Sequence, residues 1–410
     1  MRKSLIASLS VLVAVGTISL PLIASATTAL AAGSRQPLPI GKQLAELKGS
    51  DTVAGDGFGA PVAISGTTAI VGAWPHARGG RAYVFAETKG RWKQTAELKG
   101  SDTVARDDFG SSVALSGKTA IIGAPGHARG GGRAYVFSEA KGTWNQVAEL
   151  KGSDTYDGVT CQGDLCPGGS FFATAVAISG KTALVGATNQ AKEAGRVYVF
   201  TETKGTWNQT AELKGSGTPL GAQFGTSVAI SGTTAVVGAN GDPTGGGRAY
   251  VFTETPRGWA QVAVLKGSDT VMNDYFGSSV AVSGTTAVVG AYAHAKLTGR
   301  AYIFTIIKGI WTQAVELGSD TAAYGGLFGG SVAISGTTVV VGANFQADNA
   351  GRAYVFTEAR GAWKRDAELV GSDTVAGDSF GCSVAISGTT VAVGAFRHAK
   401  GAGSAYVFEA

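Results

Sequence analysis

All four histidines of the sequence occupy one recurring position, where each is followed by alanine and then by arginine or lysine. These residues are His76, His127, His294 and His398. An imidazole can act as a metal ligand, as a proton acceptor or as a hydrogen-bonding group for a bound molecule. Zinc needs its ligands within about 2 Å of one ion, whereas whole sequence repeats separate these histidines. We therefore expect no metal site and no cofactor.

Aromatic residues accompany three of the histidines. Trp74, Tyr292 and Phe396 each lie two residues before a histidine, and Gln190 and Gln346 take the histidine position in two further repeats. Aromatic rings beside hydrogen-bond donors and cations can contact a sugar or a peptide. We therefore treat these aromatics and the four histidines as a possible ligand face. The alternative is that they are turn residues without partners, since single exposed aromatics are common.

Acidic residues follow the same repetition, which argues against a catalytic pair. Of the 29 Asp and Glu residues, all but a few fall in four recurring positions. The exceptions are Asp108, Asp157, Asp164, Glu193, Asp242, Asp348 and Asp366. They are spread along the chain and offer no obvious pair of converging carboxylates, which a glycosidase needs. The sequence also lacks an HExxH motif and a glycine-rich phosphate loop, so we expect no catalytic residues and no enzymatic activity.

These recurring positions belong to a repeat marked by a Phe-Gly step. Its phenylalanines are Phe58, Phe109, Phe172, Phe224, Phe276, Phe328 and Phe380. A regular period of about fifty residues predicts a repeat architecture. The period is lengthened once, by an insertion at residues 156–169 before the third blade. The insertion carries Cys161 and Cys166, for which a disulfide is plausible in an oxidising compartment, whereas Cys382 replaces other small residues.

Each repeat contains four apolar runs joined by short turns. In the second repeat they read SVALS, TAIIGA, RAYVF and WNQVAEL. Such runs predict a four-stranded antiparallel sheet, and seven of them predict an all-β, seven-bladed β-propeller rather than an open solenoid. The last repeat lacks a fourth run, whereas KQLAEL at Lys42–Leu47 precedes the first Phe-Gly step. We expect this N-terminal strand to complete the seventh blade and close the ring, because closure removes a bare sheet edge.

Polar residues at the ends of these runs are expected to hold the blades. Arginines open the third run of six repeats: Arg81, Arg133, Arg196, Arg248, Arg300 and Arg352. We expect them to bond to Asp side chains or carbonyls of the inter-blade loops, which would lock neighbouring blades. The Ser and Asp of the recurring GSD turns are expected to bond to nearby backbone and fix those turns.

The repeat resembles the FG-GAP repeat, the blade unit of integrin α-subunit propellers, and looks like the secreted bacterial members of that family. Phe-Gly stands in six copies and Phe172-Ala173 in the third, and GAP itself is present at Gly123-Ala124-Pro125. The resemblance implies a propeller. The kelch repeat is the alternative family, and it would also imply a propeller. Integrin-like blades often bind calcium in an Asp-rich first hairpin. Here that hairpin is Ser65-Gly66-Thr67 and its copies, without Asp or Glu, so calcium binding is not expected to carry over.

The first 31 residues read as a signal peptide. Arg2 and Lys3 precede an apolar stretch, and Ala29-Leu30-Ala31 follows with the small residues of a cleavage site. We therefore expect a secreted, extracellular protein with a linker at 32–41, a propeller at 42–410 and no membrane span. The formal net charge of +5 is too small and scattered for nucleic-acid binding.

The sequence as a whole favours a binding or adhesion module without catalytic activity. We expect a monomer whose loop face meets an extracellular protein or glycan ligand, an expectation that rests partly on analogy with the fold. One alternative is a multivalent lectin with equivalent sites between the blades. The other is an extracellular propeller hydrolase or lyase, which would need a deep central pocket lined by the acidic residues outside the repeat.

Overall fold

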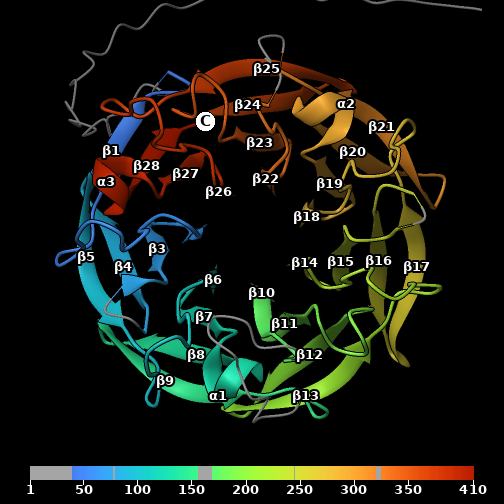
Figure 1. Cartoon of the computed structure of the whole chain (residues 1–410), viewed down its shortest axis with the longest axis horizontal. Helices are drawn as coiled ribbons and strands as arrows, with labels where there is room; N and C mark the ends of the chain where they lie inside the picture. Colours follow the sequence, from blue (N-terminus) through green and yellow to red (C-terminus); the bar gives the residue numbers. More distant parts are fainter. Residues whose placement is uncertain (1–38, 77–78, 156–168, 244, 320–324) are drawn as a thin grey trace, which may run out of the picture. The chain divides into compact units, whose positions relative to one another are not determined.

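Seven four-stranded antiparallel sheets surround a central axis, as Figure 1 shows. The computed structural model describes residues 39–76, 79–155, 169–243, 245–319 and 325–410. In each sheet the strands follow one another from the axis to the outer wall, in sequence order except at the ring closure. The chain therefore forms the seven-bladed β-propeller that the repeat predicted.

Six blades are formed by consecutive strands. Blades 1 to 3 contain β2 (Val62–Ser65), β3 (Thr68–Ala73), β4 (Arg81–Thr88), β5 (Arg91–Leu98); β6 (Ser112–Ser116), β7 (Thr119–Ala124), β8 (Arg133–Ala140), β9 (Thr143–Leu150); and β10 (Phe172–Ser179), β11 (Thr182–Ala187), β12 (Arg196–Thr203), β13 (Thr206–Leu213). Blades 4 to 6 contain β14 (Ser227–Ser231), β15 (Thr234–Ala239), β16 (Arg248–Thr255), β17 (Gly258–Leu265); β18 (Ser279–Ser283), β19 (Thr286–Ala291), β20 (Arg300–Ile307), β21 (Ile310–Leu317); and β22 (Ser331–Ser335), β23 (Thr338–Ala343), β24 (Arg352–Ala359), β25 (Ala362–Leu369).

The seventh blade combines the two ends of the described chain. It contains β26 (Val384–Ser387), β27 (Thr390–Ala395), β28 (Ser404–Glu409) and, at its outer edge, β1 (Gln43–Leu47). The strands β1 and β28 are antiparallel, with Glu46 opposite Tyr406 and Leu47 opposite Ala405. The N-terminal strand therefore closes the ring, as its sequence match to the other fourth strands predicted.

The phenylalanine of each Phe-Gly step lies between two blades. Phe109 is fully buried and packs with Ile70 and Val84 of blade 1 and with Tyr135 of blade 2. Its backbone forms an isolated parallel bridge to Gly80 of the preceding blade. The adjoining Gly110 has φ +91°, and a β-carbon there would collide with backbone of blade 1. The Phe-Gly step is therefore the wedge that joins consecutive sheets.

A second contact between blades lies in the hairpins that join each first and second strand. The backbone N–H of Gly117 in blade 2 donates to Ser65 Oγ of blade 1 at 3.0 Å. The corresponding bond from Gly66 to Ser387 Oγ, at 2.9 Å, connects blade 1 to blade 7. The hairpin in which integrin-like blades hold calcium thus forms a repeated hydrogen bond between neighbouring blades here.

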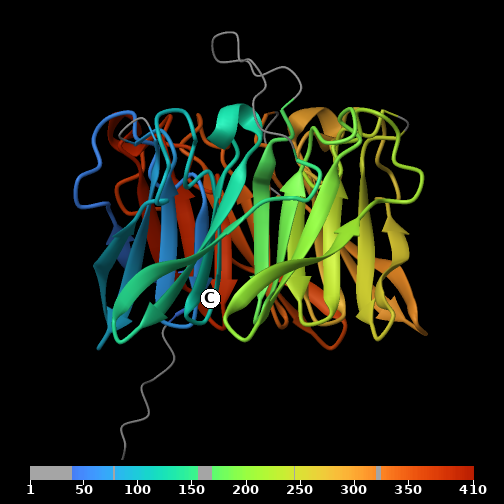
Figure 2. The ribbon, with the colours of Figure 1, turned by 90° about the horizontal axis from the view of Figure 1, so that it is seen from below.

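Two kinds of loop meet at one face of the ring. The connections between second and third strands, which include α1 (His127–Gly130), α2 (His294–Leu297) and α3 (His398–Gly401), lie on the same side as the connections between consecutive blades. Figure 2 shows α1 and α2 on this side, which we call the loop face. The four histidines, the aspartates of the inter-blade loops, and Trp74, Tyr292 and Phe396 belong to it.

Some sequence predictions concern residues outside the described ranges. The signal peptide at 1–31, most of the linker, and Cys161 and Cys166 lie there. Among the described residues, no helix has the length and apolar character needed to cross a membrane.

Candidate functional site

The four histidines of the loop face are each held between two aspartates. In blade 1, His76 Nδ1 lies 2.6 Å from Asp56 Oδ2, and His76 Nε2 lies 3.4 Å from Asp51 Oδ2. The other oxygen of Asp51 accepts a hydrogen bond from the hydroxyl of Tyr83, which is buried in β4. Asp56 also accepts the backbone N–H of Val53 and thereby fixes the turn. The inter-blade loop, the connection between β3 and β4, and the strand β4 are thus tied together by one polar network.

The same network recurs in blades 2, 5 and 7 with similar distances. The bond from histidine Nδ1 to the second aspartate measures 2.8 Å for His127–Asp107, His294–Asp274 and His398–Asp378. The contact from Nε2 to the first aspartate measures 3.6 Å for His127–Asp102, 3.4 Å for His294–Asp269 and 3.5 Å for His398–Asp373. These histidines are therefore not turn residues without partners: each Nδ1 is bonded to one aspartate, and each Nε2 faces a second carboxylate at a longer distance.

In blade 2, the surroundings of His127 favour the charged form of its imidazole. The hydrogen bond to Asp107 raises the pKa of His127, while burial opposes this shift. The negative charge of Asp102 adds to the increase in pKa, and the positive charge of Arg133 reduces it. A protonated imidazole can donate from both nitrogens, which suits a position between two carboxylates.

The remaining blades vary the network in a consistent way. Histidine occurs only in the blades that carry both aspartates. Blade 3 has Ser170 at the second aspartate position, and its hydroxyl donates to Gln190 Oε1 at 2.9 Å. Blade 4 has lost both aspartates, and Asp242 in the histidine position pairs with Arg248 Nε at 2.7 Å. The residue at the histidine position thus changes together with the residues at the two aspartate positions. This correlation is not visible when each position of the repeat is considered separately.

The arginines of the third strands have a partner that was not predicted, a glutamate of the neighbouring fourth strand. In blade 1, Arg81 Nε donates to Glu97 Oε1 of β5 at 2.7 Å, and Arg81 Nη1 donates to the carbonyl of Gly80. The same Arg–Glu pair occurs in blades 2, 3, 5 and 6. The guanidinium thus forms an ion pair within its own sheet in these blades, which the sequence did not predict.

These glutamates bring a third ligand-like group toward the histidines. In blades 2, 5 and 7, one His nitrogen, one Asp oxygen and one Glu oxygen lie within 4.8 Å of one another. The groups are Asp102, His127 and Glu149; Asp269, His294 and Glu316; and Glu46, Asp373 and His398. The sequence argument against metal considered only convergence of several histidines, so it missed sets formed by one histidine and two carboxylates.

Aromatic side chains gather on the loop face at three places. Trp74 of blade 1 is 41% exposed, and Tyr275 of blade 5 stacks on Tyr292 with ring centroids 5.2 Å apart and planes at 8°. The guanidinium of Arg397 lies 5.2 Å from the ring centre of Phe396 and 5.9 Å from that of Phe345. The structure thus gives partners to two of the predicted aromatics.

Sequence reasoning missed three of these residues for identifiable reasons. Tyr275 lies in the loop before its Phe-Gly step and has φ 56°, where the other repeats carry residues without a shared type. Phe345 is displaced by one residue from the position of Trp74, and Arg397 immediately precedes its histidine. None follows a motif, and only the fold brings them together.

The central cavity contains no acidic group among its described lining residues. First strands and the residues before them line it, including Ser112, Thr174, Thr226, Ser279 and Val332. Of the acidic residues outside the repeat, Asp108, Glu193, Asp242, Asp348 and Asp366 lie in different parts of blades 2, 3, 4 and 6 and are not part of this lining. Asp157 and Asp164 lie outside the described residues.

The fold and its repeated networks define a seven-bladed β-propeller with one conserved blade plan. A model of the FG-GAP repeat matches seven times, at residues 42–85, 92–137, 167–200, 207–252, 259–304, 311–356 and 363–408. Because these matches cover well over half of the chain, the protein belongs to the FG-GAP repeat family. This membership confirms the resemblance seen in the Phe-Gly steps.

Comparison of structures agrees on the fold alone. A chain in a crystal structure of the mitotic checkpoint complex superposes with a TM-score of 0.55 and 13% sequence identity, covering 97% of this chain and 99% of that one. No curated protein matches the sequence.

Proposed function

We propose that this propeller is a secreted, non-catalytic binding module whose loop face meets an extracellular protein. The observation that carries this proposal is the uneven distribution of exposed aromatic and cationic groups on that face. The stacked pair of Tyr275 and Tyr292 lies in blade 5, and Arg397 with its two phenylalanines lies at blades 6 and 7. Aromatic and Arg side chains are the usual anchors of protein interfaces.

Exposed aliphatic side chains add to the same face. Val53, Val104, Val271 and Val375 occupy equivalent inter-blade turns and are each more than 60% exposed. Met272 is 63% exposed and lies three residues before Tyr275. A rim of valines with aromatics on one side offers apolar surface on a scale that a partner protein could cover.

The distribution favours a protein over a lectin with equivalent sites. Sites repeated between blades would require the aromatics to recur, whereas they occur only in some blades. A glycan ligand is the second candidate, because exposed aromatic rings such as the stacked Tyr275 and Tyr292 can also hold a sugar. A hydrolase or lyase finds no support in the described lining of the central cavity, where no carboxylate is present.

The test is a screen of the chain without residues 1–31 against extracellular proteins and glycans, followed by surface variants. We expect the double variant Tyr275→Ala/Tyr292→Ala to weaken binding of an identified ligand at least tenfold. Ile310→Ala is the control, because Ile310 is 67% exposed and lies beside the β20–β21 hairpin, away from the loop face. Equal binding by both variants would contradict the proposal, and binding to glycans alone would select the second candidate.

A further inference from the structure

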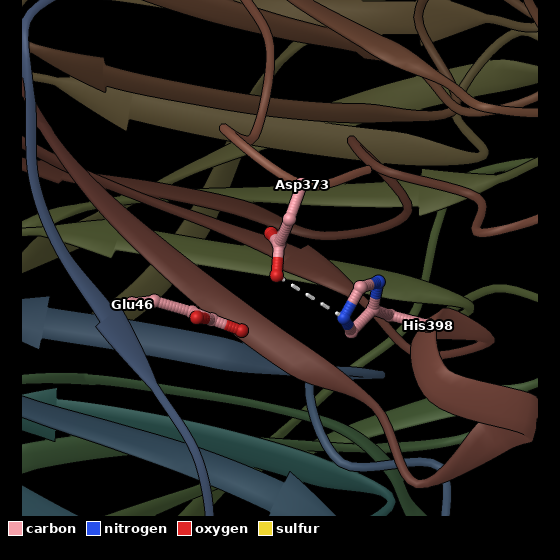
Figure 3. Close-up of side chains that lie close together, drawn as sticks. All are labelled: Glu46, Asp373 and His398. Carbon is pink, nitrogen blue, oxygen red and sulfur yellow. Dashed lines mark ion pairs between the residues drawn. The ribbon is translucent and has the colours of Figure 1, made fainter. Parts of the chain in front are cut away.

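We propose that Glu46, Asp373 and His398 of the seventh blade form a binding site for Zn²⁺. Figure 3 shows their carboxylates and imidazole directed toward one another. One ligand atom from each lies within 4.8 Å of the others, and His398 Nε2 is 3.5 Å from Asp373 Oδ2. Ligands of a tetrahedral zinc ion lie about 2.0–2.1 Å from it and hence about 3.3 Å apart. The His–Asp separation is already suitable, and a small movement of Glu46 would complete the set.

The donor set suits zinc and leaves a coordination position open. Zinc binds imidazole nitrogen together with carboxylate oxygen, and sites with three protein ligands keep a fourth position for water or another molecule. Calcium and magnesium prefer oxygen ligands alone, so the imidazole of His398 selects against them. The site is distinct from the Asp-rich calcium loops of related propellers, because it lies on the loop face and uses a histidine.

The neighbours of the site hold its ligands in place. His398 Nδ1 bonds to Asp378 Oδ2 at 2.8 Å, and the hydroxyl of Tyr406 donates to Asp373 Oδ1 at 2.7 Å. A carboxylate on the far nitrogen of a metal-binding histidine fixes the ring and makes the ligating nitrogen more basic. Both oriented ligands are supplied with the hydrogen bonds that metal sites require.

The seventh blade differs from blades 2 and 5 in the residue that faces the glutamate of the set. In blades 2 and 5 an arginine forms an ion pair with the glutamate of the set, with Arg133 Nε 2.8 Å from Glu149 Oε1 and Arg300 Nε 2.6 Å from Glu316 Oε1. Blade 7 has Ser404 at this position, and its neutral hydroxyl donates to Glu46 Oε1 at 2.9 Å. Lys48 Nζ also lies 2.8 Å from Glu46 Oε1, but the lysine side chain is 56% exposed.

This difference explains why the proposal is restricted to one of three similar clusters. A guanidinium is a permanent cation with a fixed geometry, and its ion pair with the glutamate opposes the binding of a second cation there. An exposed lysine can leave the carboxylate at little cost, because surface ion pairs contribute little free energy. Replacement of Arg by Ser therefore leaves the carboxylate of Glu46 beside a neutral hydroxyl and an exposed lysine rather than a guanidinium, so that it can turn toward an ion held by Asp373 and His398.

Because the site lies where the two ends of the propeller meet, a bound ion would affect closure of the ring. Glu46 belongs to β1, whereas Asp373 and His398 belong to the last repeat. Every other blade has its four strands in continuous sequence, but blade 7 depends on non-covalent pairing of β1 with β28. A bound ion would join the two segments and stabilise the closed ring in proportion to its occupancy.

The test is zinc titration of the full chain by isothermal calorimetry, using protein stripped with a chelator and carrying no histidine tag. We expect one Zn²⁺ per chain and a higher melting temperature with zinc. Ser404→Arg restores the arginine of the other blades, and we expect at least a tenfold loss of zinc affinity without loss of fold. His398→Gln should have the same effect, because blades 3 and 6 already accommodate glutamine at this position.

Matched changes in blade 5 provide the controls. His294→Gln should leave zinc affinity unchanged, and Arg300→Ser should raise the stoichiometry from one ion to two. The proposal is overturned if the wild-type chain binds no zinc, or if Ser404→Arg and His398→Gln bind it as well as the wild type. Binding that His294→Gln reduces equally would also overturn it, since the ion would then not be specific to blade 7.

Discussion

The polar network of blade 2 provides a quantitative test of coupling between His127 and Asp107. Asp107 is 4% exposed and accepts both His127 Nδ1 at 2.8 Å and the backbone N–H of Val104 at 2.7 Å. His127→Gln removes the charged partner, and Asp107→Ser removes the carboxylate. Since a hydrogen bond to a charged group contributes about 1.5–3 kcal/mol, each single change should lower the free energy of unfolding by about 2 kcal/mol.

The double variant recreates a pair that the chain already contains in blade 3. There Ser170 Oγ donates to Gln190 Oε1, so His127→Gln and Asp107→Ser together should restore a satisfied neutral pair. We expect the double variant to lose about 1–2 kcal/mol less than the sum of the single losses, within the range typical of contacting residues. Urea unfolding followed by tryptophan fluorescence measures all three values.

The pH dependence supplies a second, independent outcome. The pKa of His127 is raised in the folded state, chiefly by the hydrogen bond to Asp107. Stabilisation from such a group is complete below the unfolded pKa of about 6.5 and is lost as pH rises through the folded pKa. His127→Gln should therefore be more destabilising at pH 6 than at pH 9. Single losses that add within about 0.5 kcal/mol, or a loss that grows with pH, would refute this account of the network.

Three further predictions concern other parts of the propeller. Burial and the nearby charge of Asp107 raise the pKa of Asp108 to about 6, so its ionisation destabilises the fold as pH rises from about 4 to 6. At pH 8, Asp108→Asn should therefore raise the free energy of unfolding by about 1 kcal/mol, a value reduced by solvent screening, and should raise the melting temperature accordingly. At pH 4 it should have little effect. Leu47→Ala should destabilise the ring by about 3 kcal/mol. Leu98→Ala in the continuous blade 1 should cost the same, because the two side chains are 2% and 3% exposed. A much smaller loss for Leu47→Ala in urea unfolding would show that β1 contributes little. Cys382 is part-buried, and desolvation raises the pKa of its thiol to about 11. Alkylation at pH 8 should therefore be slow until urea unfolds the chain, and rapid labelling of the folded chain would contradict this.

The blade plan was predictable because short-range patterns determine it. Apolar runs, turn residues and the Phe-Gly period indicate where each strand lies, and the unmatched strand at Lys42–Leu47 indicates how the ring closes. These features depend on residue type and spacing within one repeat. The pairing of β1 with β28 confirms that such local information suffices for the topology of a repeat protein.

The arginine partners were not predictable because they depend on a β-bulge. In blade 1 the register between β4 and β5 shifts at Val84/Phe85, which places Glu97 opposite Tyr83. A shift of one residue moves a side chain to the other face of a sheet, so without the bulge Glu97 would lie opposite Ala82 and point away from Arg81. No residue type in the strand marks the bulge, although it recurs in every blade from 1 to 6.

Exceptions to the repeat carry more information about function than the repeat itself. A group repeated in every blade, such as the buried tyrosine that includes Tyr83 and Tyr406, stabilises each sheet in the same way and singles out no blade. Ser404 in place of arginine changes the charge beside Glu46 only in the blade that closes the ring. Similarly, the stacked pair of Tyr275 and Tyr292 lies in blade 5, and no other blade has such a pair among the described residues. In a ring of equivalent blades, a single ligand or ion can be selected only where that equivalence is broken, so both proposals depend on these few departures.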